Sequence, residues 1–388
     1  MSILRRGTRL LTITLAALTI STFVGAEVID DDTPVPPAGT PGGPTVPLTG
    51  ADLEQWIRGR KVFDRDWRLD QGLGTPELNA DSCRSCHQHP VIGAAGQLDT
   101  NVFRFGADNN GNGPFVDLPG GQIASKLRRV DVPGREDANG AADVFEVRQT
   151  PSLLGIGLLE TIPESAILAN EDPFDTDGDG VRGVARMIAI GGAFEVGRYG
   201  WKAQIPTVSD FLRDAVSEEI GITLPDDGRG FGLLTDSDPV PDPEIVDADF
   251  DDALFFLMNL APPPRAGGTD PAIPQGEALF STIGCATCHI PTLPGAGGPV
   301  PLYSDLLLHD IHPAEFRGMA EPDAPVGMYR TPPLWGVRDT SPYLHDGSAT
   351  TLEDAILRHG DEALNARTNY EQLTAGEQDA LLLFLEDL

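Results

Sequence analysis

The chain has 388 residues, of which 40% are hydrophobic and 22% are charged, a composition typical of a globular protein long enough for two domains. Its formal net charge of −32 argues against nucleic acid and against an anionic membrane surface as partners. Aromatic residues make up only 6%, while Gly and Pro number 44 and 34, so we expect short helices joined by long, ordered loops.

The N-terminus is typical of a secretion signal. Three arginines within the first nine residues precede an uncharged apolar run at 10–24, and Val24-Gly25-Ala26 fits the small-residue cleavage rule. The apolar run is shorter than a usual membrane span. We therefore expect a signal peptide at 1–26, a periplasmic or otherwise exported protein, and no membrane span after cleavage; an uncleaved anchor is the alternative. Residues 27–50 are rich in Asp, Pro, Gly and Thr and predict a flexible linker.

All four cysteines belong to two C-x-x-C-H motifs, one at Cys83, Cys86 and His87 and the other at Cys285, Cys288 and His289. Four cysteines in an exported protein would otherwise suggest two disulfides, but this spacing is the attachment signature of haem c. The two thiols bond to the vinyl groups of one porphyrin, and the adjacent His reaches the iron. The sequence therefore predicts two covalently bound haem c groups.

The same landmarks recur in the same order around both motifs. They are a short helix before each motif (59–63 and 276–280), an Arg followed closely by Thr-Pro (Arg148 and Arg330), a Glu-x-Ala-Ile-Leu stretch (164–168 and 353–357), and a closing apolar helix (251–257 and 378–385). We therefore predict a mainly α fold with two cytochrome-c-like helical domains, 51–263 and 270–388, joined by irregular loops. The first would carry insertions at 64–81 and 169–246.

The second insertion contains an acidic stretch with interleaved glycines. Asp175, Asp177 and Asp179 stand at alternate positions, which suits a hard cation with oxygen ligands such as calcium. Arg186 stands where an EF-hand would have its bidentate Glu, so the motif is incomplete. The alternative interpretation is an acidic turn without a metal.

Several stretches resemble the di-haem oxidoreductases of the putative-peroxidase family, which are related to bacterial di-haem cytochrome c peroxidases and MauG-type enzymes. The matching stretches are 157–164, 197–203, 303–310, 330–336 and 342–347. The resemblance implies an enzyme that reduces hydrogen peroxide with electrons from a small cytochrome c or cupredoxin. The alternatives are a pure electron-transfer di-haem cytochrome c and a MauG-like enzyme that oxidises a protein or organic substrate.

The reaction class depends on the sixth ligand of each iron, because an iron with strong ligands on both faces transfers electrons and does little else. For the second haem the resemblance implies a Met from the region of Met328, with Tyr329 and His309 as alternatives. For the first haem no distal ligand is evident, which favours an open iron. We expect His345 to belong to the second haem pocket and His312 and His359 to be surface residues.

Peroxide cleavage also needs a base and an acid. The resemblance implies a Glu over the active haem, and Glu164 and Glu160 are the candidates, with helix capping or a salt bridge as the alternative role. We expect Arg148 and Arg330 to pair with haem propionates, because buried propionates need a partner charge. The related enzymes place a Trp between the haems, but residues 90–150 contain none, so Trp201 is the remaining candidate.

Overall fold

The computed structural model describes residues 29–388, apart from 31, 75–77, 120–122, 125, 127–138 and 314. The expected signal peptide lies outside the described residues. The described part of the segment expected to be a flexible linker packs against the helix at 50–64 and against the residue that follows the helix at 247–258. The buried Arg60 side chain donates hydrogen bonds to the carbonyl oxygens of Thr33 and Pro34, and the Thr45 amide donates to the carbonyl of Asn259. A buried guanidinium needs such acceptors, so these hydrogen bonds hold residues 33 and 34 against the helix that contains Arg60.

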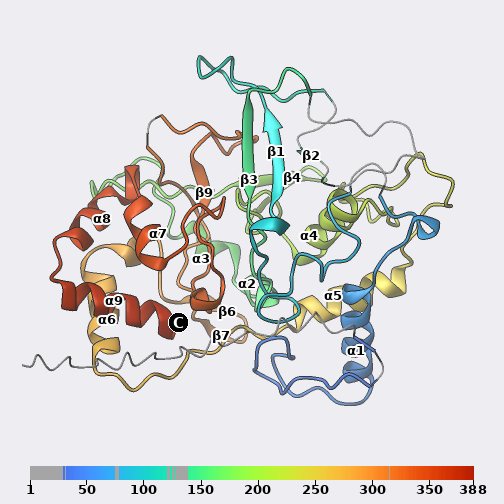
Figure 1. Cartoon of the computed structure of the whole chain (residues 1–388), viewed down its shortest axis with the longest axis horizontal. Coiled ribbons are helices and arrows are strands. Elements are labelled where there is room, and N and C mark those ends of the chain that lie inside the picture. Colours follow the sequence, from blue (N-terminus) through green and yellow to red (C-terminus); the bar gives the residue numbers. More distant parts are fainter. Residues whose placement is uncertain are drawn as a thin grey trace, which may run out of the picture.

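Two pairs of crossing helices organise the two halves of the chain (Figure 1). In the first half α1 (Gly50–Asp64) packs on α5 (Asp247–Met258), and in the second half α6 (Ala272–Thr282) packs on α9 (Ala375–Asp387). A glycine lies at each crossing. A Cβ on Gly59 would come within 1.9 Å of the Asp252 carbonyl oxygen, and one on Gly276 within 2.0 Å of the Ala380 carbonyl oxygen. Both crossings therefore depend on close backbone contact.

Each helix pair holds a phenylalanine between itself and the histidine of a C-x-x-C-H motif. The Phe63 ring lies 5.4 Å from Phe256 and 6.3 Å from His87, and the Phe280 ring lies 5.4 Å from Phe384 and 6.3 Å from His289. The distances in the two halves agree to 0.1 Å. The repeated sequence landmarks thus correspond to repeated local packing.

Shorter helices and small sheets fill the rest of the described chain. The further helices are α2 (Ile156–Glu160), α3 (Glu164–Leu168), α4 (Val208–Ala215) with a π turn at Val216–Ile220, α7 (Leu352–Arg358) and α8 (Leu364–Glu371), with 3-10 turns at Leu69–Gln71, Leu98–Thr100, Cys285–Thr287, Val337–Asp339 and Asp361–Ala363. None of the helices in the described ranges has both the length and the hydropathy of a membrane span.

The prediction of a mainly α fold did not include the strands that the structure contains. Strands β1 (Val102–Gly106), β2 (Ile123–Ala124) and β3 (Val144–Arg148) form an antiparallel sheet in the order β2-β1-β3, and three hairpins pair β4 (Met187–Ile190) with β5 (Ala193–Val196), β6 (Leu293–Gly295) with β7 (Gly298–Val300), and β8 (Leu308–Asp310) with β9 (Met328–Arg330). The sheet of β1 and β3 stands between the two helix pairs in Figure 1. Alternation along β3 places Glu146 and Arg148 inward and Phe145 outward.

The helix crossings yield a stability prediction. Gly276→Ala should lower the free energy of unfolding by about 1–3 kcal/mol, because the added methyl group forces α6 and α9 apart. Gly376→Ala in α9 is the matched control, because a Cβ there meets no atom within 4 Å and Ala favours a helix by about 1 kcal/mol. Thermal unfolding measures both. Equal melting temperatures for the two variants would contradict the close-crossing interpretation.

Candidate functional site: a cavity beside the second histidine–cysteine motif

The second motif presents one histidine nitrogen to a cavity. It follows α6 directly, and the His289 amide donates to the carbonyl of Cys285, closing the turn. The His289 Nδ1 lies 2.9 Å from the Tyr303 carbonyl oxygen, so Nδ1 carries the proton and Nε2 is left with its lone pair. Burial lowers the pKa of His289 to about 4. The ring is therefore neutral at pH 7 and can act as a metal ligand.

The first motif has the same geometry. The His87 Nδ1 lies 3.2 Å from the Ala94 carbonyl oxygen, and burial lowers the pKa of His87 to about 4. The four cysteines are free thiols, two beside each histidine. In each half a C-x-x-C pair and a neutral histidine thus lie together, as attachment of a haem c requires.

A cavity of about 490 Å³ adjoins the second motif and extends to the Thr-Pro segment of the first half, while Cys83, Cys86 and His87 are not among its lining residues. In the second half its wall includes Cys285, Cys288 and His289. From the first half come the Thr-Pro segment 150–154, whose Pro151 backbone interacts with the His87 ring, and the side chains of Tyr199 and Phe211. The size is that of a cofactor or ligand site.

Arg330 is a buried cation in this wall that has no carboxylate partner among the described residues. It donates to the carbonyl oxygens of Gly200 and Thr331, and burial lowers its pKa to about 10. A buried guanidinium without a counterion is costly, so a propionate of a bound haem would fit here. Arg148 differs from Arg330: it does not line the cavity, and it is paired with Glu146 at 2.7 Å and Glu321 at 2.8 Å.

Met328 does not reach the cavity. It packs against Ala203, Leu308 and Ala324, whereas the next two residues of strand β9, Tyr329 and Arg330, line the cavity. His309 lines the cavity, but it lies between two carboxylates. Its Nε2 is 2.8 Å from Asp305 and its Nδ1 is 2.9 Å from Glu362, so neither ring nitrogen is free for an iron.

His359 has the features that Met328 and His309 lack. It follows α7, its Nδ1 lies 2.7 Å from the Ala355 carbonyl oxygen, and it lines the cavity near enough to His289 for their charges to interact. The expectation that His359 and His312 are surface residues is wrong, because both line the cavity. The signal that could have revealed His359 is its place just after the repeated Glu-x-Ala-Ile-Leu helix.

The family model for "Di-haem oxidoreductase, putative peroxidase" matches residues 141–388, which is more than half of the chain. The chain belongs to the di-haem oxidoreductase family. It is therefore an oxidoreductase of the peroxidase-like kind that works with haem cofactors, and the sequence resemblance is confirmed.

No curated protein matches the sequence. Solved structures that resemble the di-haem oxidoreductase include a MauG-like protein associated with microbial copper homeostasis, at 19% identity and a TM-score of 0.41, covering 92% of this chain and 94% of that chain. Two others are the di-haem peroxidase BthA from Burkholderia thailandensis E264, at 16% identity and a TM-score of 0.44 over 89% and 88% of the two chains, and Kuenenia stuttgartiensis hydrazine synthase, at 15% identity and a TM-score of 0.41 over 94% and 100%.

Glu160 and Glu164 of the di-haem oxidoreductase bind backbone amides. Glu160 Oε2 accepts from the Val208 amide at 2.7 Å, at the start of α4, and Glu164 Oε1 accepts from the Val196 amide at 2.9 Å. Neither side chain lines the cavity. The structure thus brings the two carboxylates to strand and helix ends, the structural role that the sequence left as the alternative.

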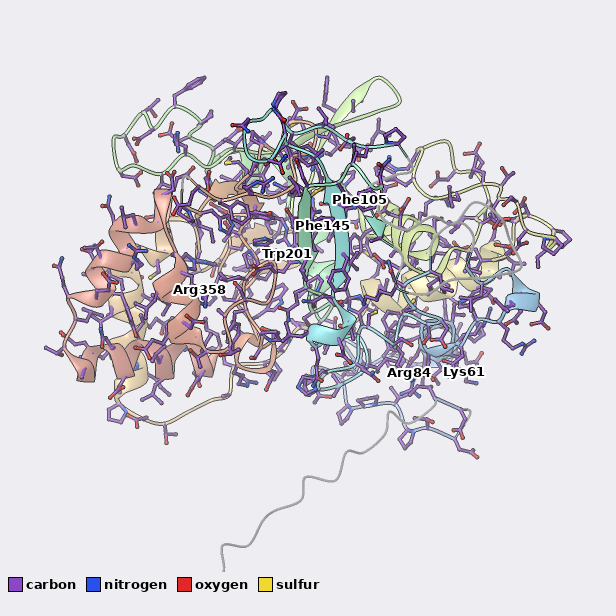
Figure 2. The ribbon with its side chains drawn as sticks, turned by 45° about the horizontal axis from the view of Figure 1, so that its top comes forward. Lys61, Arg84, Phe105, Phe145, Trp201 and Arg358 are labelled. Atoms are coloured by element: carbon purple, nitrogen blue, oxygen red, sulfur yellow. The ribbon has the colours of Figure 1, made fainter. Side chains whose placement is uncertain are left out.

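Aromatic rings line the cavity instead, among them those of Trp201, His312, Tyr329 and His345. Together with Phe316, which stacks on His312 at 4.0 Å, we define these four as the ring cluster. The Tyr329 ring stacks on His345 at 3.9 Å, and Trp201 and His312 contact His345 edge-on at 6.5 Å and 5.1 Å. The Trp201 Nε1 donates to the Gln149 carbonyl, next to the Thr-Pro segment of the first half. Figure 2 shows Trp201 near the middle of the molecule, between the labelled Arg358 on one side and Lys61 and Arg84 on the other.

The acidic loop remains a candidate calcium site. Asp175, Asp177 and Asp179 can bring one oxygen each within 4.8 Å of one another, and a second group of this kind, Asp236, Asp238 and Glu244, was not expected from the sequence. Backbone amides within the 175–180 loop donate to its own carboxylates. This geometry also fits the acidic turn without a metal.

A buried ion network supports the ring cluster. Glu321 accepts from Arg104, Arg148 and Arg186 at 2.8–2.9 Å. Burial alone would raise the pKa of Glu321, but Arg148 and Arg104 outweigh it and lower the pKa to about 2. The carboxylate thus stays charged and balances three buried cations.

Glu321→Gln should lower the free energy of unfolding by about 3–5 kcal/mol, because it leaves buried cations without a counterion. Since the pKa of Glu321 is depressed on folding, its contribution is present above about pH 5 and declines as the pH falls toward 2. Chemical unfolding at pH values from 7 to 3 measures the difference in unfolding free energy between the wild type and Glu321→Gln, and this difference should become smaller as the pH falls. Asp354→Asn is the control, because its pair with Arg358 is exposed and worth less than about 1 kcal/mol. Equal effects of the two substitutions would contradict the network's role.

Proposed function

We propose that this di-haem oxidoreductase is an exported enzyme that reduces hydrogen peroxide to water with electrons from a small cytochrome c or cupredoxin. Two haem c groups would be held by Cys83, Cys86 and His87 in a domain at 51–263, and by Cys285, Cys288 and His289 in a domain at 270–388. When bound, the haems supply one-electron transfer and an iron that can take up peroxide.

The observation that carries the proposal is an asymmetry between the two sites. At the second site His289 and His359 both line the cavity, each with Nδ1 held by a backbone carbonyl. They would hold the iron from both sides, which suits electron transfer. Besides His289 itself, His359 is the one residue among the described His and Met side chains whose Nδ1 is held by a backbone carbonyl and whose ring lines the cavity. We infer that the first iron has no second side-chain ligand and is open to peroxide.

The other histidines and methionines have other surroundings. His309 lies between two carboxylates, His312 and His345 belong to the ring cluster, His89 is near Gln97 at 3.5 Å, and Met187, Met258, Met319 and Met328 are packed among apolar or buried groups. Met1 lies outside the described residues.

Proton handling would fall to a group in the cavity, since Glu160 and Glu164 bind backbone amides. Burial lowers the pKa of His345 to about 4, so its ring is neutral at pH 7 and can accept a proton from peroxide. It lies at the point where the Gln149 amide of the first half donates to the His345 carbonyl. We propose His345 as the base and Trp201 as the aromatic contact between the two sites.

The ligand assignment predicts a change of spin state. His359→Ala should convert one of the two haems of the purified holoprotein from low spin to high spin, because the imidazole opposite His289 is removed. Electron paramagnetic resonance and the optical spectrum report this directly. Met328→Ala is the control and should leave both spectra unchanged. A high-spin signal that appears in Met328→Ala and not in His359→Ala would restore the original Met assignment.

The activity itself is tested by mixing half-reduced holoprotein with stoichiometric hydrogen peroxide and following the optical spectrum. The proposal expects a high-spin band that disappears on mixing, and peroxide-dependent oxidation of a basic small cytochrome c. The acidic surface should make that rate fall as ionic strength rises. Two low-spin haems that do not respond to peroxide would identify a pure electron carrier. A lasting response without turnover of the small donor would favour the oxidation of a protein or organic substrate.

A further inference from the structure

Tyr329 is the residue of the ring cluster with an acid-base partner. Its hydroxyl donates to Glu146 Oε2 at 2.8 Å, its ring stacks on His345 at 3.9 Å, and it lines the cavity. The Tyr329 residue is buried, with only 5% of its surface exposed to solvent. Burial and the Glu146 charge raise the pKa of Tyr329, so the hydroxyl keeps its proton at ordinary pH.

Glu146 is ready to receive that proton. Burial would raise the pKa of Glu146, but Arg148 and the Met319 amide outweigh it and lower the pKa, so the group is a carboxylate. One oxygen accepts from Arg148 at 2.7 Å, and the other accepts from the Met319 amide at 2.6 Å and from Tyr329. A tyrosine that loses an electron becomes a strong acid, and proton transfer from it requires an ionised acceptor within hydrogen-bond distance.

The surroundings also fix the ring without occupying its hydroxyl. Lys202 lies 4.3 Å from the ring centroid, and its ammonium donates to the carbonyl oxygens of Pro325 and Met328 at 2.9 Å. His312 contacts the ring edge-on at 5.2 Å. The tyrosine is thus rigid, dry and in contact with aromatic neighbours that lead through His345 to Trp201.

We propose that Tyr329 is a redox-active residue that transfers electrons one at a time, with Glu146 as its proton acceptor. In the oxidising step the ring gives up one electron, and the hydroxyl proton moves to the Glu146 carboxylate, which leaves a neutral tyrosyl radical and a carboxylic acid. In the reducing step an electron from the donor protein returns to the ring and Glu146 returns the proton. Hydrogen peroxide is the oxidant: two passages deliver the two electrons that one peroxide takes up, and two protons from solvent complete its conversion to two waters, while the Tyr329 proton only moves to Glu146 and back.

This inference rests on the proposed peroxide chemistry, and its test separates the two. The holoprotein is treated with hydrogen peroxide without a donor, and in a second experiment with a photo-oxidised ruthenium tris-bipyridine complex, which removes one electron without peroxide. Freeze-quench electron paramagnetic resonance then detects radicals, and incorporation of ring-deuterated tyrosine identifies a tyrosyl signal by its narrower lines.

The wild type should give a tyrosyl signal with both oxidants, and Tyr329→Phe should lose it with unchanged haem spectra. Tyr303→Phe is the matched control: Tyr303 is also buried and donates to a carboxylate, Glu277, at 3.1 Å, but it does not line the cavity. It should keep the signal. Glu146→Gln should keep the tyrosine but slow radical formation and remove the slowing that D₂O causes in the wild type.

A signal of wild-type size in Tyr329→Phe, or no tyrosyl signal in the wild type with either oxidant, would overturn the inference. If peroxide is not consumed but the ruthenium oxidant gives the Tyr329 signal, the proposed peroxide function fails and the redox role of Tyr329 stands. If peroxide is consumed without any signal that depends on Tyr329, the function stands and Tyr329 has a structural role.

Discussion

A buried imidazole can hold an iron atom only if its other nitrogen is satisfied, and this requirement shapes both halves of the chain. His87, His289 and His359 each place Nδ1 against a backbone carbonyl, which fixes the tautomer and aims the remaining lone pair. The rings must also be held in place from behind. Phe63 and Phe280, packed at the glycine crossings of the helix pairs, back the rings of His87 and His289. The close helix crossings thus position the ligands.

The wall of the cavity follows a second constraint, which is that charge removed from water must be balanced. Glu321 balances three arginines, and Glu146 balances Arg148 while accepting from Tyr329. Arg330 is left without a carboxylate, at the place where a cofactor could supply one. The network explains why Arg148 and Arg330, which occupy matching positions in the repeat, have different partners.

The sequence was sufficient where the signal is local. The two C-x-x-C-H motifs and the helices before and after them follow from spacing, and the family follows from the resemblance of particular sequence stretches. Met328 was misplaced because the sequence did not reveal strand β9, in which Tyr329 and Arg330 line the cavity and Met328 does not. The backbone partners of Glu160 and Glu164 could not be predicted, because the amides of Val208 and Val196 lie at least 32 residues away. Long-range backbone contacts of this kind leave no mark on local spacing.

The proposed difference between the two sites rests on His359 in the second half and on one segment of the first half. The helix pairs, the phenylalanines and the anchored histidines are repeated, so the repeat alone would give two equivalent sites. The insertion at 169–246 has no counterpart in the second half, and it supplies Tyr199, Trp201 and Phe211 to the cavity wall and Lys202 to the ring of Tyr329. A duplicated scaffold can hold two cofactors, but different roles for them require contacts that only one half provides. In this chain those contacts come from His359 and from the insertion.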